Sequence, residues 1–454
     1  ALAFAAIAGV LPGFRSVAQR MIDADSTAVC RAQDEFAVPP RDDIERFTVV
    51  RAGRIIPVVG KEIEGGEIVI SDGKIQNIGR GIEVPLNAKV IDARDQVVMP
   101  GLIQASSRFG MPWYRRSGVH ADLRVADEFV ATPLQFEGLL NAGFTTVALI
   151  PAGVGIPGRA MVIRTAGDDM ESRTLVETSY IYISASKADL RDALSKAQAE
   201  IDKVDKARKE FEEKQKQAAA KQNQSDTPPQ TQPANGNGKG EKPPASQPAS
   251  QPTSQPAFEP PKINPALQPL VDLLQKKEGV RALIVIDSAS DYVQISEVLA
   301  EYEIAHDFRV RNGSQCDLHL VLDKLREAKP RMLFNARNHT IPYSVERNPL
   351  IRLVAQAGCE VSLLPRGDSA SEAGVVLQRI AELVRNGWSR QEALKAVTIH
   401  PAKLLGVDKR VGSLEKEKDA DLIFLDGDPF AAGTRVRRVM IAGETVHVAE
   451  GDEQ

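Results

Sequence analysis

The sequence predicts an α/β fold with a parallel sheet, joined to a small β unit that is built from both ends of the chain. Two observations predict it. From about residue 100 to 397, short β-rich runs alternate with helical patterns, as successive βα units do. Residues 47–98 and 406–448 flank this span and are rich in strand patterns. At 454 residues with 43% hydrophobic content, the chain is long enough to bury a large core.

The small β unit begins near Phe47. Gly66–Ile75 alternates polar and apolar residues and turns at Asp72-Gly73, which is a strong hairpin signal. Near the other end of the chain, Asp421–Leu425 and Val436–Val446 also have strand patterns, with Gly443 at a turn. We therefore expect residues 47–98 and 406–448 to form one composite domain.

The βα span supplies the candidate strands and helices of the sheet. The predicted strands are Thr145–Ile150, Ser179–Ile183, Ala282–Ile286, Asp307–Val310, Arg331–Phe334 and Glu360–Leu364. The predicted helices between them are Pro133–Ala142, Lys187–Glu210, Tyr292–Tyr302, Asp317–Ala328 and Asn348–Ala357.

Composition excludes several classes of function. The net charge of −4 gives no electrostatic reason to bind nucleic acid, so no nucleic-acid partner is predicted. The three cysteines, Cys30, Cys316 and Cys359, are too few and too scattered for a disulfide framework or a zinc knuckle. We expect them to be small buried thiols.

The first residues form an apolar run, Ala1–Leu11, which is too short to span a bilayer. Its length fits the hydrophobic part of a signal peptide, so residues 1–20 are interpreted as a leader. A leader would place the protein in the periplasm or cell envelope of a bacterium. The alternative is a buried helix in a cytoplasmic protein. No other stretch predicts a membrane span.

A second segment, residues 222–261, is mostly Pro, Gln, Ser, Ala, Gly and Asn. It has almost no large apolar residue, so it cannot build a core, and we predict that it is disordered. The short Pro-containing repeats either form an inert spacer or dock a protein partner.

Three segments resemble the amidohydrolase superfamily, in particular its imidazolonepropionase-like and dihydroorotase-like members. They are Val97–Gly110, Asn141–Val147 and the long run from Glu392 to Pro429. The resemblance implies a (β/α)₈ TIM barrel over residues 99–405, joined to a β-sandwich made from both chain ends. It also implies hydrolysis of non-peptide C–N bonds, such as those of cyclic amides, with zinc or another divalent metal.

The chain departs from the family where the metal binds. The family's first strand carries a His-x-His pair that ligates the metal, and Ser106 and Arg108 stand in those two places. Serine is a poor ligand, and arginine has no lone pair to donate. The histidines expected after the fifth and sixth strands are also missing. We therefore treat Ser106 and Arg108 as degenerate metal positions and predict no metal or other cofactor.

The remaining candidates are polar residues at the expected barrel mouth. The resemblance makes Asp368 the candidate catalytic base, two residues later than the family's spacing, and a loop cap is the alternative. The candidate substrate-binding or anion-binding residues are Arg108, Arg337, His339 and Arg366. Arg115 and Arg116 lie in the same region. These arginines either bind an anion or pair with local acids, and we expect Arg108 to pair with Asp368.

Three functions follow. The first is a catalytically degenerate family member that binds a small molecule. The second is an active hydrolase with an atypical metal site or none. The third is an exported scaffold that uses the Arg-lined mouth or the Pro-rich segment to bind a protein partner. Homo-oligomers are compatible with all three.

Overall fold

The computed structural model describes residues 47–85, 87–111, 115–130, 136–225, 257–311, 313, 316–337 and 350–449. The expected leader lies outside these ranges, as does most of the expected disordered segment. In the parts of the chain that are described, no helix combines the length and apolar character that crossing a bilayer requires.

Strands from both chain ends share one mixed sheet. The first part supplies β1 (Thr48–Ile55), β2 (Ile63–Ser71), β3 (Lys74–Gly79) and β4 (Lys89–Pro100), and the last part supplies β16 (Leu422–Leu425), β17 (Val436–Ile441) and β18 (Glu444–Val448). The order is β18-β17-β16-β4-β1-β2-β3, with β1 and β4 parallel and the other neighbours antiparallel. These seven strands, drawn from both chain ends, form one hydrogen-bonded sheet.

The chain passes from this sheet to the βα region at Pro100-Gly101. The Gly101 N–H donates to the carbonyl of Asp421, which ties the turn to the returning C-terminal part. A Cβ at Gly101 would overlap the Thr145 side chain, so this close approach requires glycine. The turn therefore fixes where the next strand begins.

The βα region contains two further sheets. One has the order β10-β9-β7-β5, and its strands are β5 (Leu102–Ser107), β7 (Phe144–Leu149), β9 (Met161–Arg164) and β10 (Thr174–Val176). The other has the order β15-β14-β13-β12-β11-β8-β6. Its strands are β6 (Arg116–Val119), β8 (Gly153–Arg159), β11 (Tyr180–Ser184), β12 (Arg281–Ile286), β13 (His306–Val310), β14 (Arg331–Asn335) and β15 (Glu360–Leu364). The six predicted strands are confirmed to within one residue at either end.

The two sheets approach each other at both ends. On one side, β8 pairs with β11 and β9 pairs with β7, both antiparallel, so residues 153–164 link the sheets. On the other side, the Ile103 N–H donates to the carbonyl of Val397 and the Leu363 N–H donates to that of Ala396. Residues 396–397 therefore bridge β5 and β15. The antiparallel link departs from the expected run of parallel strands.

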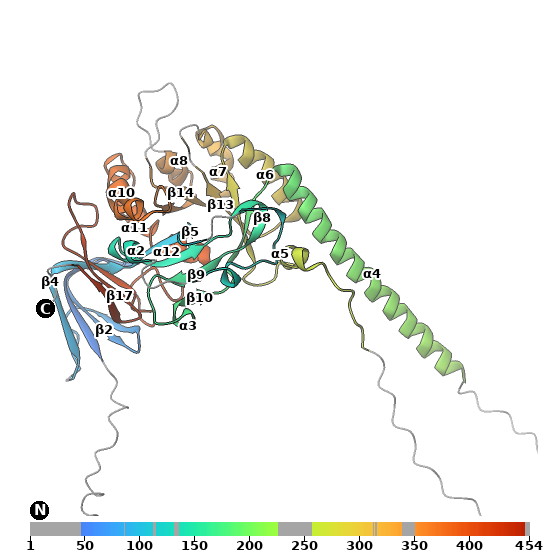
Figure 1. Cartoon of the computed structure of the whole chain (residues 1–454), viewed down its shortest axis with the longest axis horizontal. Helices are drawn as coiled ribbons and strands as arrows, with labels where there is room; N and C mark the ends of the chain where they lie inside the picture. Colours follow the sequence, from blue (N-terminus) through green and yellow to red (C-terminus); the bar gives the residue numbers. More distant parts are fainter. Residues whose placement is uncertain are drawn as a thin grey trace, which may run out of the picture. The chain divides into compact units, whose positions relative to one another are not determined.

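Helices connect the strands (Figure 1). They are α2 (Glu137–Asn141), α3 (Met170–Arg173), α4 (Lys187–Ser225), α5 (Gln268–Leu274), α6 (Ala289–Tyr302), α7 (Leu322–Ala328), α8 (Leu350–Gln356), α9 (Ala370–Gly374), α10 (Val376–Arg385), α11 (Arg390–Lys395) and α12 (Ile399–Leu405). Short 3₁₀ turns occur at Val125–Asp127, Pro265–Leu267 and Leu318–Val321.

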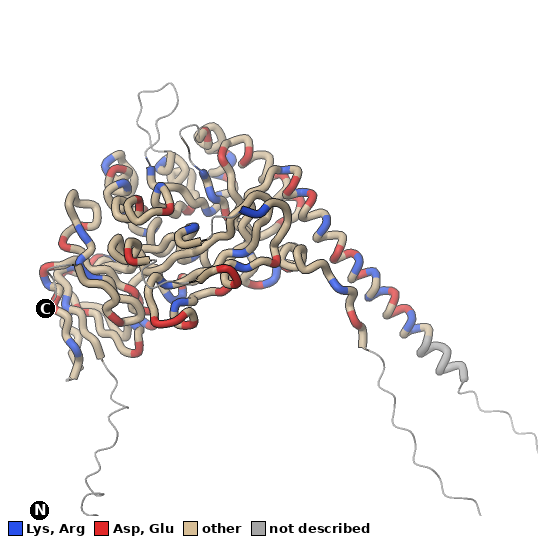
Figure 2. The backbone as a smooth tube through the Cα atoms, in the orientation of Figure 1, with Lys and Arg blue, Asp and Glu red and all other residues tan. Residues whose placement is uncertain are grey.

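Helix α4 is longer than its predicted range of Lys187–Glu210. Its fully buried residues, Leu190, Ala193, Leu194 and Ala197, all lie in the first three turns. The rest of the helix extends beyond the strands, and acidic and basic residues alternate along it (Figures 1 and 2). The charged residues along this part of α4 thus form a solvated helix face.

Candidate polar site at the strand ends

A buried serine and an arginine meet at the centre of the candidate site. Ser106 lies near the end of β5 and is 1% exposed. The Arg309 Nη1 on β13 donates a hydrogen bond to the Ser106 Oγ at 2.6 Å. Phe308, the residue before Arg309, packs against Tyr292 of α6 with ring centroids 5.3 Å apart. Because successive strand residues face opposite sides, Arg309 points away from that helix and toward β5.

Arg309 has no counter-ion in the described part of the chain. Among the residues that the structure describes, no carboxylate lies within ion-pair distance of its guanidinium, and its buried Nε has no hydrogen-bond partner. Asp307 lies on the same face of β13, but it pairs with Arg281 at 3.0 Å and with Arg331 at 2.7 Å. Within the described ranges the positive charge of Arg309 is therefore uncompensated, which is unfavourable for a half-buried cation.

Asp368 is the acid of the site. It follows β15, and its Oδ1 accepts hydrogen bonds from the Ser107 Oγ at 2.8 Å and from the Gln104 Nε2 at 3.2 Å. Both donors are neutral and almost fully buried. The predicted ion pair between Arg108 and Asp368 is therefore wrong. Short neutral side chains of β5 reach the carboxylate directly, and they hold it without a cation.

Tyr180 is a buried residue that contacts the β5 backbone beside Ser106. Its hydroxyl donates to the carbonyl of Ala105 at 2.8 Å. Burial raises the pKa of Tyr180 far above its usual value, and the positive charge of Arg309 opposes this only in part. The phenol therefore stays protonated and neutral at physiological pH.

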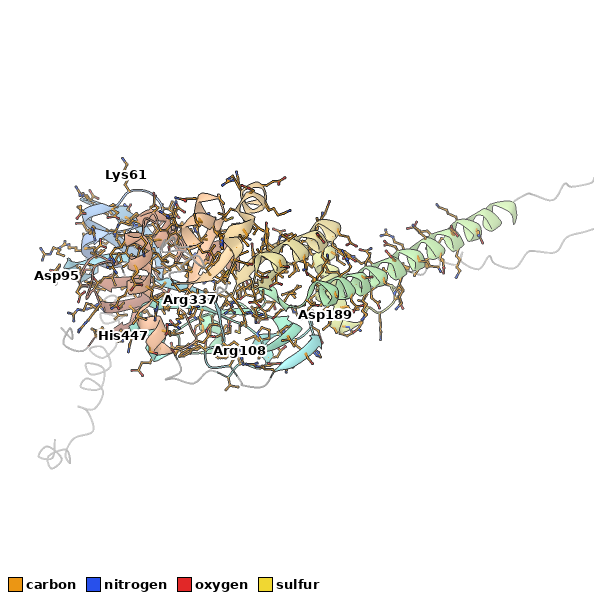
Figure 3. All side chains as sticks on the ribbon, turned by 90° about the horizontal axis from the view of Figure 1, so that it is seen from above. Lys61, Asp95, Arg108, Asp189, Arg337 and His447 are labelled. Carbon is orange, nitrogen blue, oxygen red and sulfur yellow. The ribbon has the colours of Figure 1, made fainter. Side chains whose placement is uncertain are left out.

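The other predicted residues are spread around the strand ends. Arg108 follows β5 and Arg337 follows β14, and both are half-buried (Figure 3). Arg366 is exposed, and its backbone carbonyl lies 3.5 Å from the Asn335 amide nitrogen. Arg116 forms an ion pair with Glu128 at 2.6 Å. Of the two roles considered for the arginines, Arg116 therefore pairs with a local acid. His339 lies outside the described residues.

The residues at the resembled metal positions do not fit a divalent ion. The Ser106 oxygen accepts a hydrogen bond from a permanent cation, and a metal placed there would be repelled by Arg309. Across the described ranges, no three His, Cys, Asp or Glu side chains are grouped so that they could hold a metal. The buried His400 contacts the backbone instead: its Nδ1 lies 2.9 Å from the carbonyl of Val361, and burial lowers the pKa of that imidazole.

Arg309 was not among the predicted site residues, because the family resemblance implies a histidine after β13 and draws attention away from arginine. The signal that could have revealed it was simple: Arg309 is a charged residue between the apolar Phe308 and Val310, on a strand expected to be buried. A lone charge in such a run is rare unless it is paired or functional. Gln104 carried a similar signal within the first strand.

Three comparisons bear on the family. Residues 272–446 match the model of the amidohydrolase family. Over 68 residues the chain is 41% identical to the N-acetylglucosamine-6-phosphate deacetylase of Bos taurus, a match that covers 15% of each protein. Over 72 residues it is 38% identical to the corresponding protein of Homo sapiens, which covers 16% of each. These matches thus span a small part of the relatives' length.

Among solved structures, an amidohydrolase from Thermotoga maritima MSB8 matches with a TM-score of 0.68 and 19% identity, covering 88% of this chain and 100% of that one. At this identity the likeness concerns the fold. It extends over the chain-end sheet and the βα region together.

Proposed function

We propose that the chain is a catalytically degenerate member of the amidohydrolase family, and that it binds a small anionic molecule where that family holds a metal. In this proposal it is a pseudoenzyme whose site is built around Arg309.

We infer that the two sheets of the βα region form the wall of a (β/α)₈ barrel. Their contacts through residues 153–164 and 396–397 support this, as does the likeness to a solved amidohydrolase. In such barrels the site lies at the carboxyl ends of the strands. Ser106 and Arg309 lie near the ends of β5 and β13, and Asp368 follows β15.

The observation that carries the proposal is the hydrogen bond from Arg309 to Ser106. Arg309 places a fixed positive charge at the first degenerate metal position. Two like unit charges 4 Å apart repel by about 4 kcal/mol at the effective dielectric near a protein surface, so a metal ion and Arg309 compete for this place. The guanidinium itself presents a planar fork that suits carboxylates and phosphates.

Asp368 alone would give a weak hydrolase. A positioned general base contributes about 10²–10⁴-fold to rate, and a metal supplies in addition the activated water and the polarised carbonyl. The neutral donors Ser107 and Gln104 orient the Asp368 carboxylate, but they supply neither an activated water nor a polarised carbonyl.

The test is binding of small anions to the whole chain. Thermal shift and calorimetry with inorganic phosphate and a panel of small carboxylic acids should reveal at least one ligand. Arg309→Gln should abolish that binding, and Arg94→Gln should not, because Arg94 is an exposed arginine in the chain-end sheet. Equal binding by wild type and Arg309→Gln would reject the proposal.

One rival function has its own support. An active hydrolase, with an atypical metal site or none, is favoured by the local identity to deacetylases and by the retained Asp368. Steady hydrolysis of cyclic amides or N-acetylated amino sugars that is lost in Asp368→Asn would establish it. Export through residues 1–20 and docking of a protein partner through residues 222–261 also remain proposals.

A further inference from the structure

We propose that the ligand is a zwitterion of the free amino-acid class, whose carboxylate binds Arg309 and whose ammonium group binds Asp368. This inference rests on the proposed function, because it names the kind of molecule that the site would take.

The first support is the charge of the two side chains. Arg309 carries a positive charge and Asp368 a negative one, and in the described part of the chain neither lies within ion-pair distance of an opposite charge. Both side chains can be reached by a ligand, since Arg309 is partly exposed and Asp368 is exposed. A ligand therefore has one free cation and one free anion to contact.

The second support is the spacing of their anchors on β5. Gln104 donates to Asp368, and Ser106 accepts from Arg309. These two residues are separated by one position, so their Cα atoms lie at most about 7 Å apart. Ser107, which also donates to Asp368, is the next residue after Ser106. The charged atoms of an amino acid are separated by roughly 3 Å of covalent structure. With a hydrogen bond of about 2.8 Å at each end, a single small zwitterion can reach both side chains.

The third support comes from the ligands that fit less well. A simple anion would satisfy Arg309, but it would be repelled by Asp368. A divalent metal would satisfy Asp368, but it would be repelled by Arg309. A molecule with both charges a short distance apart is attracted by both side chains and leaves neither uncompensated.

The experiment compares matched forms of one ligand on the full chain. Each of the common free L-amino acids is first titrated singly by calorimetry. The tightest binder is then compared with its N-acetyl derivative, which keeps only the carboxylate, and with its amide, which keeps only the ammonium group. We expect the free form to bind at least about tenfold more tightly than either derivative.

Two variants test which side chain binds the carboxylate and which binds the ammonium group. Arg309→Gln should lose binding of the free amino acid and of its N-acetyl derivative, whose carboxylates contact Arg309, but it should not weaken binding of the amide. Asp368→Asn should lose the preference for the free amino acid over its N-acetyl derivative, since no anion remains to attract the ammonium group. Arg94→Gln should behave as wild type.

Other results would overturn the inference. If the N-acetyl derivative or a plain carboxylate binds wild type as tightly as the free amino acid, the proposed zwitterionic ligand is wrong. The proposed anion site at Arg309 is then still supported. The same holds if no amino acid binds while phosphate or a carboxylic acid does. If no anion of any kind binds, both the inference and the proposed function fail. The ligand comparison uses wild type, so it decides even if a variant does not fold.

Discussion

The Arg309 Nη1 lies 2.6 Å from the Ser106 Oγ and joins two strands that are far apart in the sequence. In the proposed function, this contact places a cation where the first metal ligand of the amidohydrolase family would stand. Nearby, Asp307 holds Arg281 and Arg331 in ion pairs. The chain thus contains compensated arginines and an uncompensated one on neighbouring strands, and the two kinds should respond differently to mutation.

Arg309→Met should change the free energy of unfolding by less than about 1 kcal/mol in the absence of ligand. The variant removes one hydrogen bond and also removes a half-buried charge that has no counter-ion, so the two effects oppose each other. Urea denaturation of the folded chain measures this. A large loss of stability would mean that Arg309 is a structural residue and would weaken the case for a binding role.

Asp307→Asn should destabilise the protein by about 3 kcal/mol, because it leaves Arg281 and Arg331 without their shared carboxylate. Asp307 is almost fully buried, so solvent cannot replace it. The same denaturation experiment gives the comparison with Arg309→Met. Equal effects of the two substitutions would contradict the distinction between paired and unpaired arginines.

Gly101→Ala should destabilise by about 3 kcal/mol or more, since the new methyl group would overlap the Thr145 side chain at the turn between the chain-end sheet and β5. Gly374→Ala is the matched control, because a Cβ there meets nothing within 4 Å. Thermal melting of both variants tests this. A mild effect at Gly101 would show that the two parts of the chain can move apart easily.

Asp421→Asn should stabilise the protein at neutral pH. Burial raises the pKa of Asp421, although Arg164 opposes the shift, so the folded state favours the neutral acid. A raised folded-state pKa contributes stability that is present in acid and is lost as the pH rises through that pKa. The advantage of asparagine over aspartate should therefore appear near neutral pH and vanish below about pH 4, near the unfolded-state pKa. Denaturation curves from acid to neutral pH would refute this if the two proteins differ by a constant amount.

Much of the fold could be predicted from the sequence because its signals are local. Runs such as Ala282–Ile286 and Glu360–Leu364 are apolar and sharply bounded, and both are strands. The antiparallel link in residues 153–164 was not predicted, since Gly153, Gly155 and Gly158 weaken a strand pattern. The end of α4 was also placed too early, because a charged helix face has no apolar period to follow.

The site was harder to predict because it depends on contacts between distant residues. The degenerate positions Ser106 and Arg108 could be found by comparison with a motif. The partner of Ser106 could not, since Arg309 is 203 positions away and enters the site only through the pairing of strands. The pair of Arg108 and Asp368 was expected from charge alone. Ser107 and Gln104 donate the hydrogen bonds that the Asp368 carboxylate accepts.

Histidine restored at the first strand should not create a tight metal site. In Ser106→His with Arg108→His, Arg309 still supplies a positive charge, and the family's other histidines are still missing. Zinc titration with a competing chelator measures the affinity. Tight binding by the double variant would show that Arg309 does not oppose a metal and that two ligands suffice.

The central claim is that Arg309 stands in place of a divalent metal. The most direct test is the metal content of the wild-type protein, purified without chelators, incubated with zinc, dialysed and measured by elemental analysis. The account predicts a content far below one metal ion per chain, unchanged in Ser106→Ala. One tightly held ion per chain in wild type, lost in Ser106→Ala, would contradict it.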